Sequence, residues 1–314
     1  MIAFIFPGQG AQKVGMGRAL AEAFDICRTT FEQADAAIGE PLSQTIFDGP
    51  EDRLMLTENT QPAILAVSTA AFRLLESRGV TPAFVAGHSL GEYSANVAAG
   101  TFSFADALRL VRRRGQYMQE AVPVGAGAMA AILGLDAEQV SEACAAAAED
   151  LQQVVSPANL NGAGQVVIAG TRDGVARASE RARALGAKRA VPLAVSAPFH
   201  CALMRPAEER LAPELRALET CDPRVAVIAN VDAEPKRTAA AAIEALVRQV
   251  SSPVRWEAVV ARLASEGVTT YVEVGPGTVL SGLVRKIHKD AAVVNFGSPD
   301  DLEAVERTLA RTLS

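Results

Sequence analysis

The sequence predicts an α/β fold with a smaller subdomain inserted into it. Short apolar runs alternate with longer alanine-rich segments of helical spacing, which is typical of a mainly parallel sheet covered by helices. The chain has 314 residues, of which 49% are hydrophobic and 5% aromatic. One large domain with an insertion fits this length, and its core must be built from small and aliphatic side chains.

Apolar runs are predicted to form the strands of the main sheet. In chain order they are Ile2–Phe6, which ends at Pro7-Gly8, then Ala83–Ala86, Val225–Ala229, Thr270–Val274 and Ala292–Phe296. Helical spacing predicts helices between these strands. These are Gln61–Arg78, stopped by Gly79, Ser103–Glu120, with Ser103 as its N-cap, and Cys201–Leu218.

The middle of the chain has a different order of elements. We expect strands at Ala126–Leu133, Gln152–Ser156, Gln165–Ala169 and Lys188–Leu193, with helices at Ala137–Glu149 and Gly174–Leu185. This βαββαβ order is that of a ferredoxin-like unit. The expected division is a small subdomain over residues 125–194 and a large domain made of residues 1–124 and 195–314. A ligand cleft is expected between the two.

Charge and cysteine content exclude several classes of function. The formal net charge of −6 argues against a general nucleic-acid binder. No two cysteines form a C-x-x-C pair, so we expect no zinc site and a reducing, cytoplasmic environment. The N-terminus lacks a basic region, and the longest uncharged stretch, residues 121–135, is interrupted by glycine and proline. Neither an export signal nor a membrane segment is expected. The cysteines are Cys27, Cys144, Cys201 and Cys221.

A G-x-S-x-G pattern, Gly87 to Gly91, follows a predicted strand and opens a helical segment. In that setting the two glycines allow a turn sharp enough to expose Ser89 as a nucleophile. The helix end and the N–H of Leu90 would then stabilise an oxyanion. The alternative is a glycine turn whose serine only caps the helix.

A serine nucleophile needs a base, and the chain has three histidines. His88 adjoins the serine, but the turn is expected to point neighbouring side chains apart. His288, in the basic segment RKIHK, is expected on a solvated helix face. His200, just after the inserted subdomain, is the best candidate, although a histidine in a purely structural role is the alternative.

The glycine-lined end of the first strand does not match a nucleotide-binding motif. Lys13 occupies the third glycine position of G-x-G-x-x-G, and Met16 stands where a P-loop requires lysine. What remains is a strand end suited to exposing backbone N–H groups. Gln9 is therefore a candidate for completing an oxyanion hole beside Leu90.

Six segments of the chain form a recognisable set: FPGQGAQ at 6–12, GHSLGEYSA at 87–95, RGQYMQEAVP at 114–123, SPANLNGAGQVVIAG at 156–170, SAPFHCALM at 196–204 and EVGPGTVLSGL at 273–283. Together they resemble the malonyl-CoA:acyl carrier protein transacylases of type II fatty acid synthesis. The resemblance keeps the same order over nearly the whole chain. It implies a hydrolase-like α/β domain with a ferredoxin-like insertion.

The resemblance also implies roles for individual residues. Ser89 matches the nucleophile and His200 the general base, while Gln9 and Leu90 match the backbone donors of the oxyanion hole. Gln249 matches the residue whose backbone carbonyl orients the histidine. A Ser–His dyad without an acidic third member is therefore expected.

Two further residues match positions that contact the acyl group. Arg114 matches the arginine that binds the substrate's free carboxylate, a task for which a guanidinium is shaped. Without the resemblance it would be read as one of the surface arginines Arg112–Arg114. Phe199 precedes the histidine, where an aromatic ring would crowd the α-carbon of the substrate, or would simply pack beside the site. Asn159 and Asn161 match a loop that borders the cleft.

The implied activity is transfer of a malonyl group from malonyl-CoA to the phosphopantetheine thiol of acyl carrier protein through a malonyl-serine intermediate. No bound cofactor or metal, no nucleic acid and no membrane is implied, and a monomer is expected. A malonyl loading enzyme for a polyketide synthase shares these motifs. A serine hydrolase or thioesterase is disfavoured by the missing acid and by Arg114. A non-catalytic acyl-binding protein is disfavoured because nucleophile, base and elbow are all present.

Docking of an acidic carrier protein would require a local basic patch. One candidate lies on the inserted subdomain, and the other lies near the C-terminal end. The first consists of Arg172, Arg177, Arg181, Arg183, Lys188 and Arg189, and the second of Arg285, Lys286 and Lys289.

Overall fold

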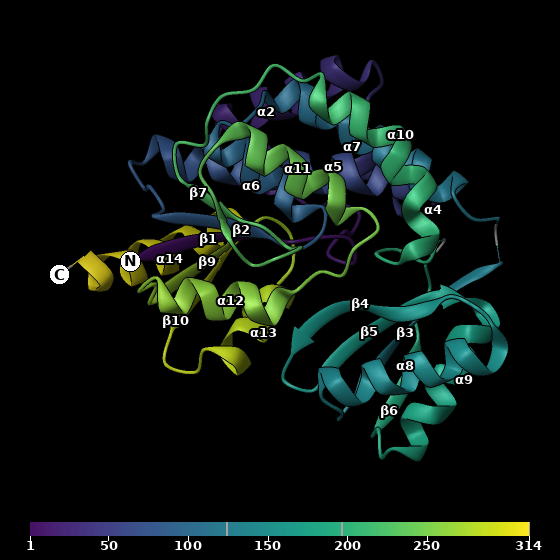
Figure 1. Ribbon diagram of the computed structural model, residues 1–314. Helices are drawn as coiled ribbons and strands as arrows, with labels where there is room; N and C mark the ends of the chain where they lie inside the picture. The colour runs from purple at the N-terminus through teal and green to yellow at the C-terminus, as the bar shows by residue number, and fades with distance from the viewer. Residues whose placement is uncertain (124, 196, 314) are drawn as a thin grey trace.

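The structure is a computed structural model, and it describes residues 1–123, 125–195 and 197–313. It contains two separate sheets, one in each of two lobes (Figure 1). The N- and C-terminal ends of the chain lie near each other on the large lobe. The large lobe contains the strands β1 (Ile2–Phe6), β2 (Phe84–Gly87), β7 (Ala226–Ile228), β8 (Pro235–Lys236), β9 (Thr270–Val274) and β10 (Ala292–Phe296).

The large sheet has the strand order β10-β9-β1-β2-β7-β8. All neighbours are parallel except β7 and β8. The register pairs Phe6 at the end of β1 with Gly87 at the end of β2. The carboxyl ends of the two central strands therefore meet at one edge of the sheet, which is where parallel sheets of this kind bind ligands.

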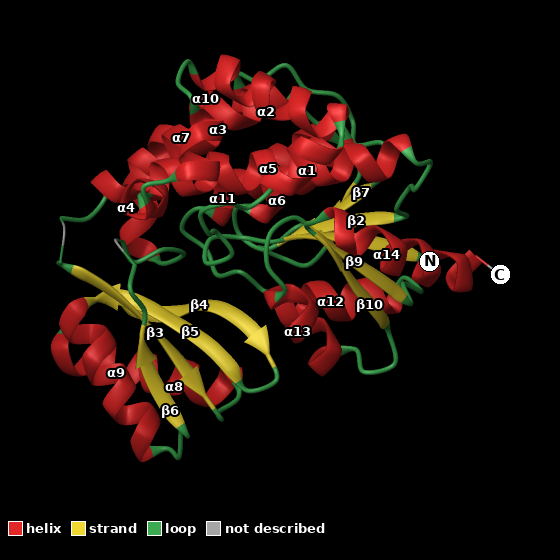
Figure 2. Ribbon diagram, turned by 180° about the vertical axis from the view of Figure 1, so that it is seen from behind, coloured by secondary structure: helices red, strands yellow, loops and turns green. Residues whose placement is uncertain are grey.

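Both faces of the large sheet are buried under helices. Alternate residues of β1 point to opposite faces, so that Phe4 and Phe6 join one core cluster and Ala3 and Ile5 join another. Figure 2 shows α5 and α6 on one side of the sheet and α12 and α13 on the other. The helices of this lobe are α1 (Arg18–Ala23), α2 (Asp25–Ile38), α3 (Leu42–Asp48), α4 (Glu51–Met55), α5 (Thr57–Ser77), α6 (Gly91–Ala99), α7 (Phe104–Glu120), α10 (Arg205–Arg216), α11 (Ala239–Gln249), α12 (Trp256–Ser265), α13 (Val279–Ile287) and α14 (Leu302–Leu313), with 3-10 turns η1 (Ala202–Met204) and η2 (Pro299–Asp301).

The small lobe is an antiparallel sheet with two helices packed on it. Its elements are β3 (Gly127–Leu133), α8 (Ala137–Leu151), β4 (Val155–Gly162), β5 (Gln165–Thr171), α9 (Arg172–Ala184) and β6 (Arg189–Pro192). The strand order β4-β5-β3-β6 is that of a ferredoxin-like βαββαβ unit. The predicted fold class is thus confirmed, while the subdomain limits of 125 and 194 stay a prediction.

Several sequence-based boundaries are wrong. The strand expected at Gln152–Ser156 is β4, Val155–Gly162, so Asn159 and Asn161 lie in a strand and not in a loop. The helix expected over Cys201–Leu218 is divided into η1 and α10, with Pro206 at the start of α10. The expected N-cap of α7 is confirmed, because the Ser103 side chain accepts the Asp106 N–H.

Residue 124, the last residue of the predicted first segment, and Ser196, the first residue of SAPFHCALM, lie outside the described residues. Within the part of the chain that the structure describes, none of the helices combines the length and the apolar character that a membrane-spanning segment needs.

Candidate active site

The turn between β2 and α6 presents Ser89 at the carboxyl edge of the sheet. A Cβ on Gly87 would lie 2.0 Å from the carbonyl of Gly91, and a Cβ on Gly91 would lie 2.0 Å from the carbonyl oxygen of Phe6. Only glycine allows these backbones to approach so closely. The turn leaves Ser89 itself at φ 52°, a left-handed conformation that is unusual for serine. Strand, strained serine and helix together have the form of a nucleophile elbow.

His200 is the histidine that contacts the serine. Its Nε2 lies 2.6 Å from Ser89 Oγ, and its Nδ1 lies 3.0 Å from the carbonyl oxygen of Gln249. Because a carbonyl can only accept, Nδ1 carries the proton and Nε2 is left to accept the serine O–H. Burial and the charge of Arg114 lower the pKa of His200 to about 3. The ring is therefore neutral near pH 7, as a base that accepts a hydroxyl proton must be.

Arg114 lies beside the same serine and is only 2% exposed. Its Nη2 donates to Ser89 Oγ at 3.2 Å and to Gln249 Oε1 at 3.1 Å, while its Nη1 donates to Gln61 Oε1 at 2.7 Å. The guanidinium also stacks over the Tyr93 ring at 5.2 Å. Burial lowers the pKa of Arg114. None of these described partners is a carboxylate, so the site holds a buried cation suited to an anion.

The neighbouring arginines behave differently. Arg112 pairs with Glu40 at 2.9 Å, and Arg113 pairs with Glu214 at 2.8 Å on the surface. Reading Arg114 as a third surface arginine is therefore wrong. The difference arises because Arg114 lies on the buried face of α7, whose residues Leu110, Val111 and Met118 are also buried.

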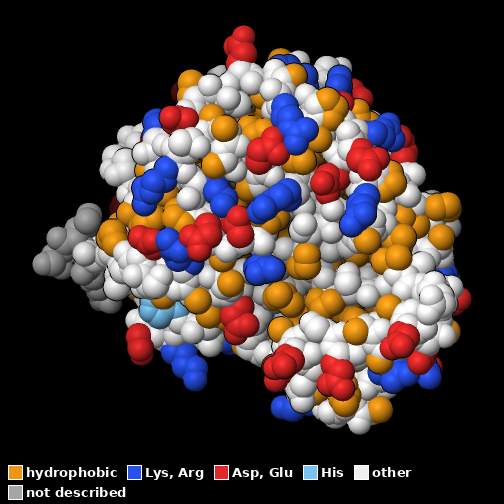
Figure 3. Space-filling view, in the orientation of Figure 1, with side chains coloured by type: hydrophobic (Ala, Val, Ile, Leu, Met, Phe, Trp, Pro, Cys, Tyr) orange, Lys and Arg blue, Asp and Glu red, His pale blue; other side chains and the backbone are white. Residues whose placement is uncertain are grey.

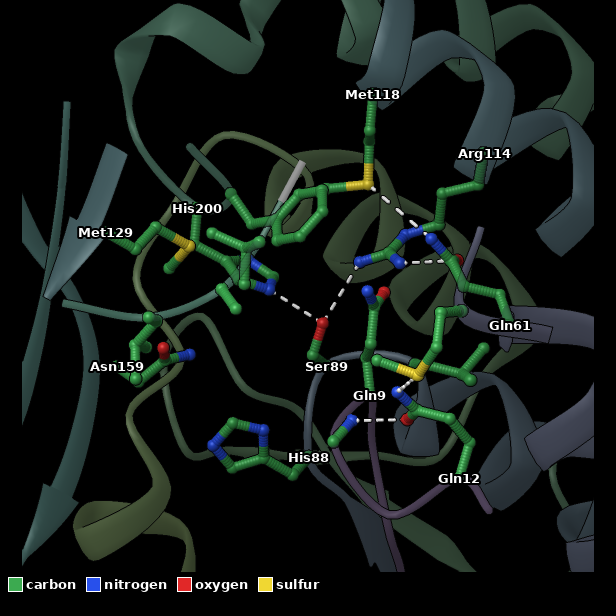
Figure 4. Close-up of a pocket in the computed structure, with 17 residues that line it drawn as sticks. Gln9, Gln12, Gln61, His88, Ser89, Arg114, Met118, Met129, Asn159 and His200 are labelled. Carbon is green, nitrogen blue, oxygen red and sulfur yellow. Dashed lines mark hydrogen bonds between the residues drawn. The ribbon is translucent and has the colours of Figure 1, made fainter. Parts of the chain in front are cut away.

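A cavity of about 440 Å³ opens over Ser89, and both lobes line it. Figure 4 shows Ser89 between His200 and Arg114. Among the described lining residues Arg114 is the one with a charged side chain. The lining consists of Gln9, Gly10, Gln12, Met55, Gln61, His88, Ser89, Leu90, Arg114, Met118, Met129, Asn159, Leu193, Ala194, Val195, Phe199 and His200. Phe199 and the methionines thus supply apolar surface around a single cation.

Gln9, just after β1, and Leu90, just after Ser89, both line this cavity. Neither backbone N–H has a hydrogen-bond acceptor among the residues that the structure describes. The side chain of Gln9 is held separately, since its Nε2 donates to Thr57 Oγ1 at 3.3 Å. Two unused N–H groups beside a serine are what an oxyanion hole requires.

Three polar residues beneath the serine were not singled out for this role by the sequence. Asn230 accepts the Ser89 N–H at 2.8 Å and donates to the Gly87 carbonyl at 2.7 Å. Gln249 Nε2 donates to the Ser89 carbonyl at 2.9 Å and to Glu92 Oε2 at 2.8 Å. Burial raises the pKa of Glu92 to about 7, against the hydrogen bond from Gln249. Glu92 lies within GHSLGEYSA, but no local pattern marks Asn230.

The other two histidines are held elsewhere. His88 Nε2 lies 2.9 Å from Asn161 Oδ1, and its ring lies 5.6 Å from that of Trp256. This contact joins the serine turn to β4 of the small lobe. His288 is not on a solvated helix face as predicted, because it follows α13 half-buried with Nδ1 3.1 Å from Tyr271 Oη. His200 is thus the histidine that the fold brings to Ser89.

Comparison with known protein families gives a match over nearly the whole chain. A family model for the acyl transferase domain matches residues 3–306. The malonyl CoA-acyl carrier protein transacylase of Bacillus subtilis (strain 168) is 49% identical over 308 residues, which are 98% of this chain and 97% of that protein. The transacylase of the same name from Escherichia coli (strain K12) is 51% identical over 303 residues, 96% of this chain and 97% of its own length.

Solved structures give the same result. An acyl carrier protein S-malonyltransferase from Vibrio cholerae superposes with a TM-score of 0.94 at 48% identity, covering 97% of this chain and 99% of that one. A malonyl-transacylase solved in complex with a type II polyketide synthase acyl carrier protein superposes with a TM-score of 0.93 at 46% identity. That match covers 96% of this chain and 97% of the other.

Proposed function

Because the chain belongs to the acyl transferase domain family, we propose that it is a malonyl-CoA–acyl carrier protein transacylase. It moves a malonyl group from malonyl-CoA to the phosphopantetheine thiol of the carrier protein, through an ester on Ser89, as a step of fatty acid biosynthesis. The observation that carries this proposal is the buried cation of Arg114, which lies 3.2 Å from Ser89 Oγ in an otherwise uncharged cavity. Malonyl differs from acetyl by a carboxylate, and the cavity offers one matching charge.

In the first half of the reaction, Ser89 Oγ attacks the thioester carbonyl while His200 Nε2 accepts the hydroxyl proton. The carbonyl oxygen becomes an oxyanion, which the N–H groups of Leu90 and Gln9 stabilise. The carbon–sulfur bond then breaks, and His200 returns its proton to the coenzyme A thiolate. The products are malonyl-Ser89 and free coenzyme A.

The second half runs in the opposite direction with a different thiol. His200 accepts the proton of the phosphopantetheine thiol, whose sulfur attacks the ester carbonyl of malonyl-Ser89. The carbon–oxygen bond breaks, and His200 protonates the serine. The carbonyl of Gln249 accepts the Nδ1–H and holds the ring in the same orientation throughout, a task that an acid performs in other serine enzymes.

Arg114 selects the acyl group in this scheme. Its guanidinium pairs with the malonyl carboxylate, while Gln61 and Gln249 hold it in place through Nη1 and Nη2. Because the cation is buried, an acyl group without a carboxylate leaves it uncompensated, which disfavours that complex. Phe199, 9% exposed in the cavity wall, is proposed to limit substituents on the α-carbon.

The proposal is tested by intact-protein mass after brief mixing with malonyl-CoA, with and without a holo acyl carrier protein. We expect a malonyl adduct on the wild type, its discharge by the carrier protein, and no adduct on Ser89→Ala. Steady release of free malonate without an adduct would indicate a hydrolase. Absence of both adduct and turnover would indicate a binding protein and contradict the proposal.

A polyketide loading enzyme is the second candidate, favoured by the relative solved with a polyketide synthase carrier protein. Both functions use the same site, so the preference between fatty acid and polyketide carrier proteins separates them. We further propose a monomer located in the cytoplasm, with no nucleic-acid partner and no bound cofactor. The four cysteines are free thiols, which suits a reducing compartment.

A further inference from the structure

Glu92 is a buried acid that the transfer scheme does not use. It lies in the first turn of α6, three residues after the nucleophile, and is 1% exposed. It does not line the cavity, as far as the described residues go, and so cannot meet the substrate directly. Since an unpaired buried carboxylate is costly, its contacts should explain why it is there.

The Glu92 carboxylate accepts hydrogen bonds from two residues that in turn hold the site. Its Oε2 lies 2.8 Å from Gln249 Nε2 and 3.0 Å from the Asn230 peptide nitrogen. Asn230 uses its own side chain to hold the Ser89 N–H and the Gly87 carbonyl. Through Asn230, Glu92 is therefore connected to the backbone of the serine turn at both Ser89 and Gly87.

The second connection runs from Glu92 through Gln249, and it depends on the orientation of the Gln249 side-chain amide. An amide has a donating nitrogen and an accepting oxygen, and Glu92 Oε2, which also receives the Asn230 N–H, is the acceptor that faces Gln249. Glu92, together with the Ser89 carbonyl, therefore keeps Nε2 on its own side, and Oε1 is left to face Arg114 Nη2 at 3.1 Å. A flipped amide would turn an N–H group toward the guanidinium, which also only donates.

Gln249 carries a third contact through its backbone, because its carbonyl accepts from His200 Nδ1. Anchoring the side chain of Gln249 thus also restrains the carbonyl that orients the base. We propose that Glu92 is a positioning residue, which fixes Gln249 and Asn230 so that Ser89, His200 and Arg114 stay aligned for malonyl transfer. This inference rests on the proposed function, since Arg114 matters here as the group that binds the malonyl carboxylate.

The test measures single-turnover acylation of Ser89 by malonyl-CoA and by acetyl-CoA. Glu92→Ala should reduce the malonyl-to-acetyl rate ratio about tenfold, as loss of an aligned hydrogen bond to a charged group implies. Malonyl acylation should fall more than acetyl acylation because Arg114 loses its orientation. Glu92→Gln keeps the volume and one acceptor oxygen, so it should restore part of the ratio.

Glu273 provides the matched control. It is also buried, and its carboxylate accepts the N–H groups of Leu280 and Ser281, away from the serine. Glu273→Ala should lower thermal stability without changing the ratio. If Glu92→Ala slows both substrates by the same factor, as a general loss of stability would, the positioning role is overturned.

The isosteric variant keeps the test decisive if Glu92→Ala does not fold. An unchanged ratio in Glu92→Gln, with the Glu92→Ala protein unfolded, would likewise overturn the inference. Wild-type protein is measured first. If it forms no malonyl-serine, the proposed function fails. If the wild type forms it and the Glu92 variants have the same malonyl-to-acetyl rate ratio as the wild type, only the positioning role is refuted.

Discussion

The two lobes contribute to the site in different ways. The large lobe supplies Ser89, Arg114 and the polar residues beneath them, all on or beside its parallel sheet. The small lobe supplies wall residues such as Met129 and Asn159. Ser89 and Arg114 thus lie in the large lobe, where buried residues hold them through hydrogen bonds, and the small lobe completes the wall of the cavity.

Both lobes carry paired and unpaired surface cations. On the small lobe, Arg177 and Arg181 both pair with Asp150. On the large lobe, Lys286 in the last turn of α13 and Lys289 just after that helix are exposed and have no ion-pair partner among the residues described. Elsewhere, acidic and basic side chains are interspersed over the face in Figure 3. On the small lobe, Arg183, Lys188 and Arg189 are likewise exposed and have no ion-pair partner among the described residues, so each lobe carries cations available to an acidic partner.

The largest effect should come from removing His200, the general base that the large lobe supplies. His200→Ala should slow Ser89 acylation by about 10²–10⁴-fold, because the hydroxyl proton loses its acceptor. Stopped-time mass measurements of the malonyl adduct give the rate, and His288→Ala is the control. Similar rates in the two variants would remove His200 from the reaction.

Charge reversal should compare the unpaired lysines near the C-terminal end with the ion-paired arginines of the small lobe as docking groups. Lys286→Glu with Lys289→Glu should raise KM for the carrier protein about tenfold at low salt, because opposite charges at a rim steer association. KM for malonyl-CoA should be unaffected. The matched variant, Arg177→Glu with Arg181→Glu, should have less effect since those cations are already neutralised. A larger effect from the small-lobe pair would reverse the assignment.

Phe199 follows the small lobe in sequence and should have a smaller effect, on selectivity alone. Phe199→Ser removes a ring from the cavity wall, so methylmalonyl transfer should rise several-fold relative to malonyl transfer, in line with the value of a few methylene groups in a pocket. Competition between the two coenzyme A esters measures the ratio. An unaltered ratio would leave Phe199 as a packing residue.

The smallest effect concerns stability, through the buried acid under the site. With its pKa raised from 4.5 to about 7, Glu92 holds a proton in the folded state that the unfolded chain lacks between these values. Its contribution to stability therefore falls as pH rises through that window. His200 acts oppositely, since its pKa falls from 6.5 to about 3 and folding loses stability as pH drops through that range.

Glu92→Gln removes the pH-dependent contribution of Glu92 to stability and keeps that of His200. The free energy of unfolding of the variant, relative to wild type, should therefore increase from pH 4.5 to 7 and then level off. Urea unfolding over this range measures it. A difference that does not vary with pH would show that Glu92 does not titrate in this window.

Local patterns were sufficient for the serine turn and for every strand of the main sheet except β8, the short antiparallel edge strand, which was not predicted. β1, β9 and β10 have the predicted bounds because each is a short apolar run with clear ends. β4 was misplaced because it contains Pro157, asparagine and glycine, which are rare in strands. It is an edge strand with register shifts beside Pro157, where a missing N–H is tolerated.

The supporting contacts of the site could not be predicted from the sequence. Gln61 and Arg114 are 53 positions apart, and Gln249 and Glu92 are 157 apart. Asparagine, glutamine and a single glutamate produce no periodic pattern, so their partners emerge only when the fold brings α5, α6 and α11 together. The resemblance to a family supplied Arg114 and Gln249, which composition alone would have left on the surface.

The most direct test of the account compares malonyl-CoA with acetyl-CoA in wild type and Arg114→Ala, measured as the rate of Ser89 acylation. The account predicts that the variant still forms an acetyl-serine and loses the malonyl preference by about 10²-fold, the value of hydrogen bonds to a buried charge. An unchanged malonyl preference in Arg114→Ala would contradict the claim that this cation selects the substrate.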